Sequence, residues 1–552
     1  MNSVLSNILI FIMCLCMGAL FYFAPLLKKR KVISLKDYFH NEKFRLLISI
    51  LLTIGFVSRT FLVDIFPGGL NQDEASAGYD AYAILTNGID RNGQFLPVHL
   101  IAWGSGQNAL YSYLCIPFIA LFGLNVFTIR IPMGIIACVT IYLVYKLLKD
   151  FYNNQASVIG LIFIIICPWH FMKSRWGLES NLFPDLVFIA FVLLVYGIKK
   201  EKNYLTYISC FIFGISSYSY GTSYFFLFFF VIATLVYLFF VKKIKWHTAL
   251  ISLGIVGITA LPIIMFIFIN LFDKESFKFL WMTIPKLNED RFSAVTNIYS
   301  NNFFKTYFEN LKAGLELLLT QNDGLIYNNL PNFGSLYLIS LPFTIFGLIL
   351  NKENKEISWI MRIWLIVAIL MMGVVDANVN RVNIVYIPLI FFTILGIVEI
   401  VQYKEVVKKT VYAMYLSCFA LFNLNYFGAS SVQIDDSFQQ SFYKAVQHAL
   451  SIKDVNNYYV TSHVNMAYIY FLFESEYDVN NYLDDVRYFN DGAAFEVPLS
   501  YDNYTFYLPT TIEEGNVYII SVWDENYEDM DLSSYEVTDF KYYYVVNTLE
   551  GE

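Results

Sequence analysis

The chain has 552 residues, of which 57% are hydrophobic and only 15% charged, and its mean hydropathy is +0.52. This composition excludes an ordinary soluble protein, and the length excludes a simple membrane anchor. We therefore expect a polytopic α-helical membrane protein.

Long apolar segments recur along the first three quarters of the chain. A helix needs about 20 apolar residues to cross the hydrocarbon core of a bilayer. On this basis we predict about 12 transmembrane helices, at residues 4–26, 46–66, 128–148, 156–172, 181–198, 204–222, 224–241, 248–272, 335–351, 358–376, 382–402 and 409–427.

Basic residues fall in alternate connections between these segments. They lie at residues 28–31, at Lys146 and Lys149, at 199–200 and 242–243, at Lys352 and Lys355, and at 408–409. Because Lys and Arg are retained on the cytoplasmic side, these connections are predicted to be cytoplasmic. Both termini and the two large loops, 67–127 and 273–334, are then extracytoplasmic. The first segment is followed by its basic cluster, which favours an anchor over a cleaved signal peptide.

The first outward loop, 67–127, is too long to be only a connection. It combines aromatic residues with apolar stretches that are shorter than a membrane span. Such stretches are typical of helices that lie in the membrane interface. We expect this loop to cover a site at the outer boundary of the bilayer.

The C-terminal part, 428–552, has a different composition, with 22 acidic and only four basic residues. Strands are predicted at 458–462, 517–522 and 542–546, and helices at 437–451 and 464–473. The chain is thus expected to have a transmembrane domain, 1–427, and a small extracytoplasmic α/β domain, 428–552. The acidity argues against nucleic acid as a partner and is also typical of a merely solvated surface.

Ionisable residues gather at the predicted outer ends of the helices. Such groups are costly at membrane level and are usually functional. They are Arg59, Asp73, Glu74, Asp80, Asp90, Arg91, Arg130, His170, Lys173, Arg175, Glu179, Asp376 and Arg381. One outward cavity could gather all of them.

Several of these residues lie in an ordered set of motifs. The set comprises Arg59, residues 67–75 (Pro-Gly-Gly-Leu-Asn-Gln-Asp-Glu-Ala), Gly78, Tyr79, Ala81, residues 87–97 with their Asn-Gly pairs, 110–123 with Tyr111, 130–132 (Arg-Ile-Pro), 168–179 with His170, Arg175 and Glu179, 331–334, and 380–388 with Arg381. The set resembles the polyprenyl-phosphate-sugar-dependent glycosyltransferases of the GT-C fold. Within them it is similar to the branch of protein O-mannosyltransferases and aminoarabinose transferases, over roughly residues 50–400.

The resemblance implies a donor sugar joined through phosphate to an isoprenoid in the bilayer and an extracytoplasmic acceptor: a cell-envelope polymer, a lipid or a protein. An inverting transfer needs a carboxylate base for the acceptor hydroxyl, and Asp73 is the candidate. Glu74 and Glu179 are predicted to assist catalysis. The donor phosphate would be bound by Arg130, Arg175 and Arg381, because guanidinium groups stabilise the charge of a leaving phosphate.

Predicted substrate contacts complete the set, at Arg59, Tyr79, Asp80, Tyr111 and His170. Some relatives bind a divalent metal ion near the loop carboxylates, and here Asp73 and Glu74 would be the ligands.

Other interpretations stay open. A transporter or flippase for lipid-linked saccharides would also place charges between helices, and it would show internal repeats and broken helices. A third interpretation is a noncatalytic membrane receptor that uses the acidic tail. Arg175 and Glu179 also fit a purely structural buried ion pair. Arg59 and Arg130 also fit side chains that reach lipid head groups from helix ends.

Overall fold

The computed structural model describes residues 3–28, 42–288, 302–350, 354–524, 532 and 534–549. Parts of two predicted features lie outside these ranges: the basic residues 29–31 and Lys352, and residues 289–301 of the second large outward loop.

The chain divides into two compact units. The first comprises residues 1–66, 130–260 and 295–430, and the second comprises 67–129, 261–294 and 431–552. The first outward loop therefore groups with the C-terminal residues rather than with the long apolar helices. This grouping differs from the linear division at residue 427 that the composition suggests, because packing joins segments that are distant in the sequence.

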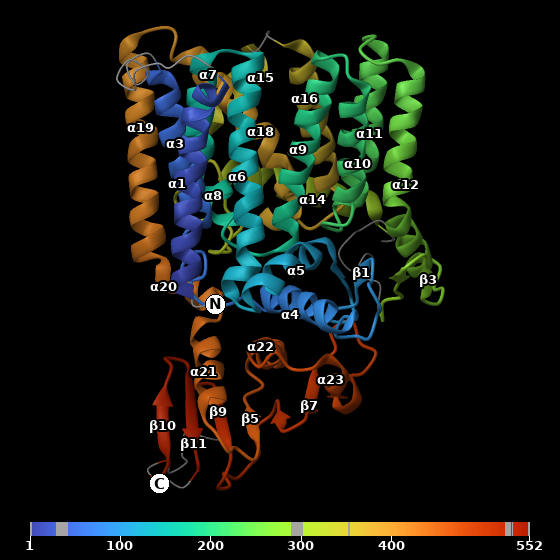
Figure 1. Ribbon diagram of the computed structural model, residues 1–552, viewed down its shortest axis with the longest axis vertical. Helices are drawn as coiled ribbons and strands as arrows, with labels where there is room; N and C mark the ends of the chain where they lie inside the picture. Colours follow the sequence, from blue (N-terminus) through green and yellow to red (C-terminus); the bar gives the residue numbers. More distant parts are fainter. Residues whose placement is uncertain are drawn as a thin grey trace. The chain divides into compact units, whose positions relative to one another are not determined.

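Long helices built from the apolar segments dominate the first unit. Figure 1 shows most of them running in nearly the same direction. Helices overlap all twelve predicted spans: α1 (Ser3–Lys28), α3 (Lys43–Thr60), α6 (Val126–Phe151), α7 (Asn154–Ile166) with α8 (Pro168–Lys173), α9 (Glu179–Lys199), α10 (Asn203–Ser216), α11 (Ser223–Phe240), α12 (Trp246–Leu271), α15 (Ser340–Leu350), α16 (Lys355–Met372), α18 (Tyr386–Ile400) and α19 (Glu405–Leu424).

Six of these stretches are long and apolar enough to cross a membrane: 3–25, α6, α9, α11, α12 and 379–400, where the short α17 (Val379–Val382) and 3-10 helix η2 (Asn383–Val385) precede α18. The remaining described helices of this unit are α14 (Phe303–Thr320) and the π-helical η3 (Asn425–Ala429). The chain is thus a multi-pass helical protein, and the number of spans stays a prediction.

Small residues allow close packing between α15 and α18, which lie in contact. A Cβ atom built on Gly347 would overlap the carbonyl oxygen of Phe392, and one built on Gly396 would overlap that of Phe343. Close backbone approach of this kind is a common way for helices to associate in a bilayer.

The loop segments of the second unit contain two helices, α4 (Gln72–Asn87) and α5 (Leu110–Phe122), where interfacial helices were expected. Between these helices, β1 (His99–Leu100) and β2 (Gln107–Asn108) form an antiparallel pair. A second antiparallel pair, β3 (Phe277–Phe279) and β4 (Met282–Ile284), belongs to the second large loop.

The C-terminal residues form a seven-stranded mixed sheet in the order β10-β11-β9-β5-β8-β7-β6. Among the described strands of this sheet, β5 alone pairs in parallel, with β8 and β9. The elements are α20 (Ser431–Ser437), α21 (Gln440–Ser451), β5 (Tyr458–Val460), α22 (Tyr468–Glu474), α23 (Val479–Asp485), β6 (Arg487–Tyr488), β7 (Pro498–Tyr501), β8 (Tyr504–Thr505), β9 (Val517–Ser521), β10 (Glu536–Asp539) and β11 (Tyr543–Asn547). All five elements predicted for this region are found close to their expected positions, and α22 packs against α4.

Candidate functional site

The Asp73-Glu74 pair forms the first turn of α4. The Asn71 side chain accepts a hydrogen bond from the Asp73 backbone N–H (2.9 Å), and the Asn71 N–H donates to Glu74 Oε2 (3.2 Å). This reciprocal capping box satisfies amide groups that a helix start leaves without partners. Glu74 is buried and bound into the cap, whereas Asp73 is partly exposed. Of the two carboxylates, Asp73 is therefore the better placed to meet a substrate.

The charges of this pair act on a tyrosine that the sequence did not single out. Tyr470 of α22 is fully buried, and its pKa is raised well above the ordinary value, first by burial and then by the charges of Asp73 and Glu74. Nothing local in the sequence indicates this, because about 400 residues separate Tyr470 from the pair.

Behind the first turn, α4 carries a buried charge cluster. Arg91 Nη1 lies 3.8 Å from Asp80 Oδ2, and Arg91 Nη2 donates to Ser76 Oγ (2.8 Å). The Arg91 guanidinium also lies 4.4 Å from the ring centroid of Trp103. Burial, and then the charge of Asp80, raises the pKa of Asp90. Asp80 thus sits inside the unit as a partner of Arg91, which favours a structural role over the predicted substrate contact.

Two predicted substrate-binding tyrosines are also interior residues. Tyr79 and Tyr111 have no exposed surface. The Tyr79 hydroxyl donates to the carbonyl of Tyr477 (2.9 Å), and the Tyr111 hydroxyl donates to that of Ile129. These contacts favour packing roles, so the substrate contacts stay predictions without structural support.

In the first unit, Arg175 binds the backbone that ends α3. Its guanidinium donates to the carbonyl groups of Phe66, Ser58, Phe61 and Leu62, at 2.8–3.1 Å. Carbonyl groups at a helix end lack intrahelical partners, and cations are stabilising there. Arg130 Nη1 donates to the next carbonyl, that of Val63 (2.9 Å). Both side chains are buried.

Arg175 and Glu179 are four residues apart and would share a helical face only in a continuous helix, which the structure does not have here. The helix stops at Lys173 and resumes as α9 at Glu179, with Arg175 in the turn between. The interruption contains Gly177, a residue of low helix propensity. Glu179 instead opens α9, where an acidic side chain complements the helix dipole.

Arg381 differs from the other two arginines in its exposure. Its side chain is 24% exposed, and Nη1 lies 3.4 Å from Asp376 Oδ2, a carboxylate that is itself 65% exposed. The Asn378 side chain accepts from the Arg381 N–H (2.8 Å) and so caps α17. Arg381 is therefore the most accessible of the three predicted phosphate-binding residues.

Arg59 and His170 meet in a buried network. Arg59 Nη2 donates to the carbonyls of Ile164 and Ile165, and Arg59 Nε donates to His170 Nδ1 (3.4 Å). His170 Nε2 lies 3.9 Å from Asp185 Oδ1, and Lys173 pairs with the other oxygen of Asp185. Sequence reasoning missed Asp185, although a carboxylate inside an apolar helix is a recognisable signal.

The side chains around Asp73 are a poor set of ligands for the divalent ion that some relatives bind. Glu74 Oε2 is already bound to the Asn71 amide, and the part of the chain that the structure describes holds no group of three His, Cys, Asp or Glu side chains suited to a metal. These residues do not fit a metal site, so no step is assigned to a metal ion.

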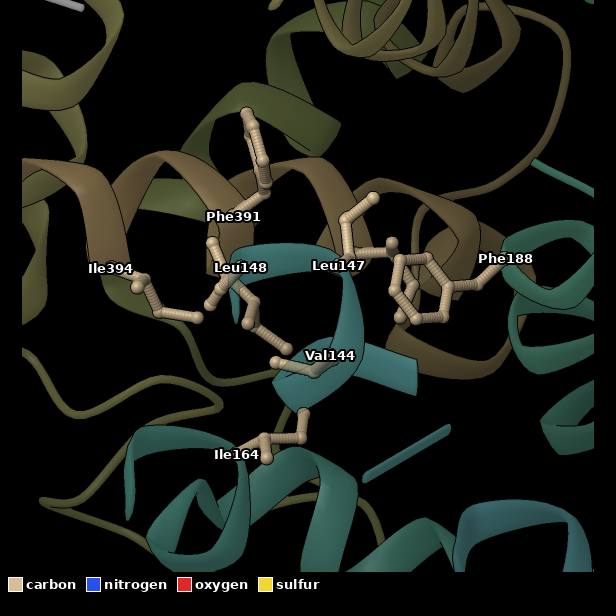
Figure 2. A pocket seen from close by; sticks show the side chains of 9 residues that line it. Val144, Leu147, Leu148, Ile164, Phe188, Phe391 and Ile394 are labelled. Carbon is tan, nitrogen blue, oxygen red and sulfur yellow. The ribbon is translucent and has the colours of Figure 1, made fainter. Parts of the chain in front are cut away.

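A small cavity lies among the helices of the first unit (Figure 2). Its volume of about 20 Å³ leaves room for about one water molecule. Aliphatic and phenylalanine side chains line it, among them Val144, Leu148, Ile164, Phe188 and Phe391. Such a lining offers no group for binding a phosphate or a sugar, so the cavity is a packing void.

Known proteins resemble this chain in sequence over one segment and in fold over most of its length. Residues 109–269 match the family of dolichyl-phosphate-mannose-protein mannosyltransferases. ArnT from Cupriavidus metallidurans in the apo state is similar at a TM-score of 0.53 and 10% identity, over 92% of this chain and 98% of that one. The chain has the GT-C fold. The ArnT structure bound to undecaprenyl phosphate gives a TM-score of 0.51 at 10% identity, over 91% and 97% of the two chains.

The resemblance expected from the motifs is thereby confirmed at the level of the fold. No match was found among curated protein sequences.

Proposed function

We propose that this chain is an integral membrane glycosyltransferase that moves a sugar from a polyprenyl-phosphate donor to an extracytoplasmic acceptor, with inversion at the anomeric carbon. The observation that carries the proposal is the partly exposed Asp73, held at the start of α4 by a cap that uses Glu74. The GT-C fold supports the same reading, because ArnT, which shares it, was solved with undecaprenyl phosphate.

Asp73 would act as the general base. Its carboxylate accepts the proton of the acceptor hydroxyl while that oxygen attacks the anomeric carbon of the donor sugar. The bond between this carbon and the phosphate oxygen breaks with its electron pair, which leaves the polyprenyl phosphate as the anionic product. Attack opposite the leaving group inverts the anomeric configuration.

The leaving phosphate needs positive charge nearby. Arginine suits this role, since its planar guanidinium can form two parallel hydrogen bonds to phosphate oxygens. Arg381 is the leading candidate on exposure. Arg130 and Arg175 already bind backbone carbonyls, so their proposed contribution is to stabilise the segment that follows α3 and to add positive charge.

The buried Glu74 and Glu179 are proposed to hold backbone around the site. Glu74 closes the α4 cap and Glu179 opens α9.

The test is a transfer assay with purified full-length protein, a panel of labelled polyprenyl-phosphate sugars and a panel of cell-envelope acceptors. The Asp73→Asn variant should retain donor binding and lose transfer by about 100-fold or more, because the base is removed. A matched control is Glu275→Gln, which neutralises a carboxylate that is 93% exposed and should leave transfer unchanged.

Wild-type transfer by Asp73→Asn would refute the proposed mechanism. If no donor is consumed but intact lipid-linked sugar crosses a vesicle membrane, the transporter interpretation replaces the enzyme.

A further inference from the structure

A second cavity of the first unit contains none of the residues assigned above to the transferase site. It has a volume of about 660 Å³ and lies where the end of α9, the start of α10, the α11–α12 connection and the start of α16 meet. This volume is within the usual range for small-molecule sites. Its charged lining residues are Lys199, Lys242, Lys243, Lys245, Glu201 and Glu356.

The lining has a surplus of positive charge. Lys243 Nζ lies 2.7 Å from Glu356 Oε1, so these two charges offset each other. Among the described residues, no carboxylate lies within ion-pair distance of Lys242 or Lys245. Two ammonium groups of the lining are therefore available to an anion.

The starts of three helices add to the positive electrostatic potential of the cavity. The lining includes Asn203 from the first turn of α10, Thr248 from that of α12, and Ile357 from that of α16. The N-cap residues of α10 and α16 make no side-chain cap hydrogen bond. Amide groups at helix starts carry partial positive charge and favour anions, which reinforces the lysines.

Apolar side chains complete the lining beside the charged ones. Val195, Ile198 and Ile360 line the same cavity. A ligand that matches both parts has a phosphate group and an apolar portion in one molecule. Inorganic phosphate would leave the apolar wall uncovered, whereas a phospholipid would cover it.

The predicted position of the cavity on the cytoplasmic side of the membrane also favours a phospholipid. The lysines belong to connections that the charge pattern assigns to the cytoplasm, and anionic lipids are enriched in that leaflet. We propose that this cavity binds the phosphate head group of an anionic phospholipid of the cytoplasmic leaflet. The proposal is independent of the transferase mechanism, because it uses none of its residues.

The experiment is native mass spectrometry of the full-length protein in detergent with phosphatidylglycerol or phosphatidylcholine of the same acyl chains. The wild-type protein should retain one phosphatidylglycerol at concentrations where phosphatidylcholine is lost. The Lys242→Gln/Lys245→Gln variant should bind it at least about tenfold more weakly, because each lysine near an anionic lipid contributes substantially to binding.

Two further variants separate charge from folding. Lys242→Arg/Lys245→Arg should restore binding, since it keeps both charges. Lys408→Gln/Lys409→Gln removes the same charge from another predicted cytoplasmic connection, outside the cavity, and should bind like the wild type.

Equal retention of the two lipids would overturn the proposal, as would unchanged binding by the double glutamine variant. Displacement of the lipid by soluble glycerol phosphate at equal concentration would assign the cavity to a free phosphate compound and would also overturn it.

Discussion

At the scale of single residues, Arg175 and Arg381 differ in burial, although the motifs suggest the same phosphate-binding role for both. Arg175 gives its donors to four backbone carbonyls at the end of α3, whereas Arg381 keeps about a quarter of its side chain exposed. A group that binds a substrate phosphate must be reachable. A group that already donates to buried carbonyls contributes mainly to the stability of the fold, because each buried carbonyl left without a partner lowers that stability by about 1–3 kcal/mol.

We therefore expect different failures from the two alanine variants. Arg381→Ala should raise KM for the lipid donor about tenfold with little change in thermal stability, since one charged hydrogen bond to the phosphate is lost. Arg175→Ala should lower the free energy of unfolding by at least about 2 kcal/mol. Donor-dependent kinetics and thermal unfolding in one detergent measure both, and the reverse pattern would exchange the two assignments.

At the scale of elements, the α4 cap links stability to the proposed base. Asn71→Ala removes the side chain that accepts from the Asp73 N–H, at a cost of about 1 kcal/mol for a helix cap. Because Asp73 is in the first turn, kcat should fall more than donor affinity. Asn153→Ala is the matched control, since Asn153 caps α7 through the Ala156 N–H (2.8 Å). Equal losses of kcat in both variants would show that the cap has no special link to catalysis.

The contact between α15 and α18 gives a second prediction for elements. Gly347→Ala and Gly396→Ala should each lower the thermal unfolding midpoint, because the new methyl group would meet backbone of the facing helix. Gly254→Ala, in α12, is the control. Its Cβ would meet nothing within 4 Å, so it should be neutral or slightly stabilising through helix propensity. Equal midpoints for the three variants would argue against the close packing.

Elements were predictable where the signal is local, and side-chain environments were not. Hydropathy locates the long helices, and short runs of β-branched and aromatic residues locate β5, β9 and β11, because each property depends on a few neighbouring residues. The break before α9 was also predicted, between the spans 156–172 and 181–198, because polar residues and Gly177 interrupt the apolar pattern there. The burial of Tyr79 depends on residues near Tyr477, and the surroundings of Asp73 depend on Tyr470, which are almost 400 residues away.

At the scale of the whole molecule, charge and packing divide the chain in different ways. The charge pattern separates an acidic tail from a basic, apolar remainder, whereas packing groups the tail with residues 67–129, which contain the predicted outward loop 67–127. The contact between α22 and α4 explains the difference. A loop and a domain that form one compact unit must lie on the same side of a membrane, so a measurement of the tail also locates Asp73.

Single cysteines can measure that side directly. A membrane-impermeant maleimide should label Lys453→Cys, an exposed position between α21 and β5, in intact cells. Lys200→Cys, exposed at the end of α9 in a predicted cytoplasmic connection, should be labelled only after the membrane is opened. The unsubstituted protein is the control, because nearly all of its seven cysteines lie in predicted helices and none lies in the tail. Labelling of Lys200→Cys but not Lys453→Cys in intact cells would invert the topology. The base would then lie on the cytoplasmic side, where the proposed acceptor is absent.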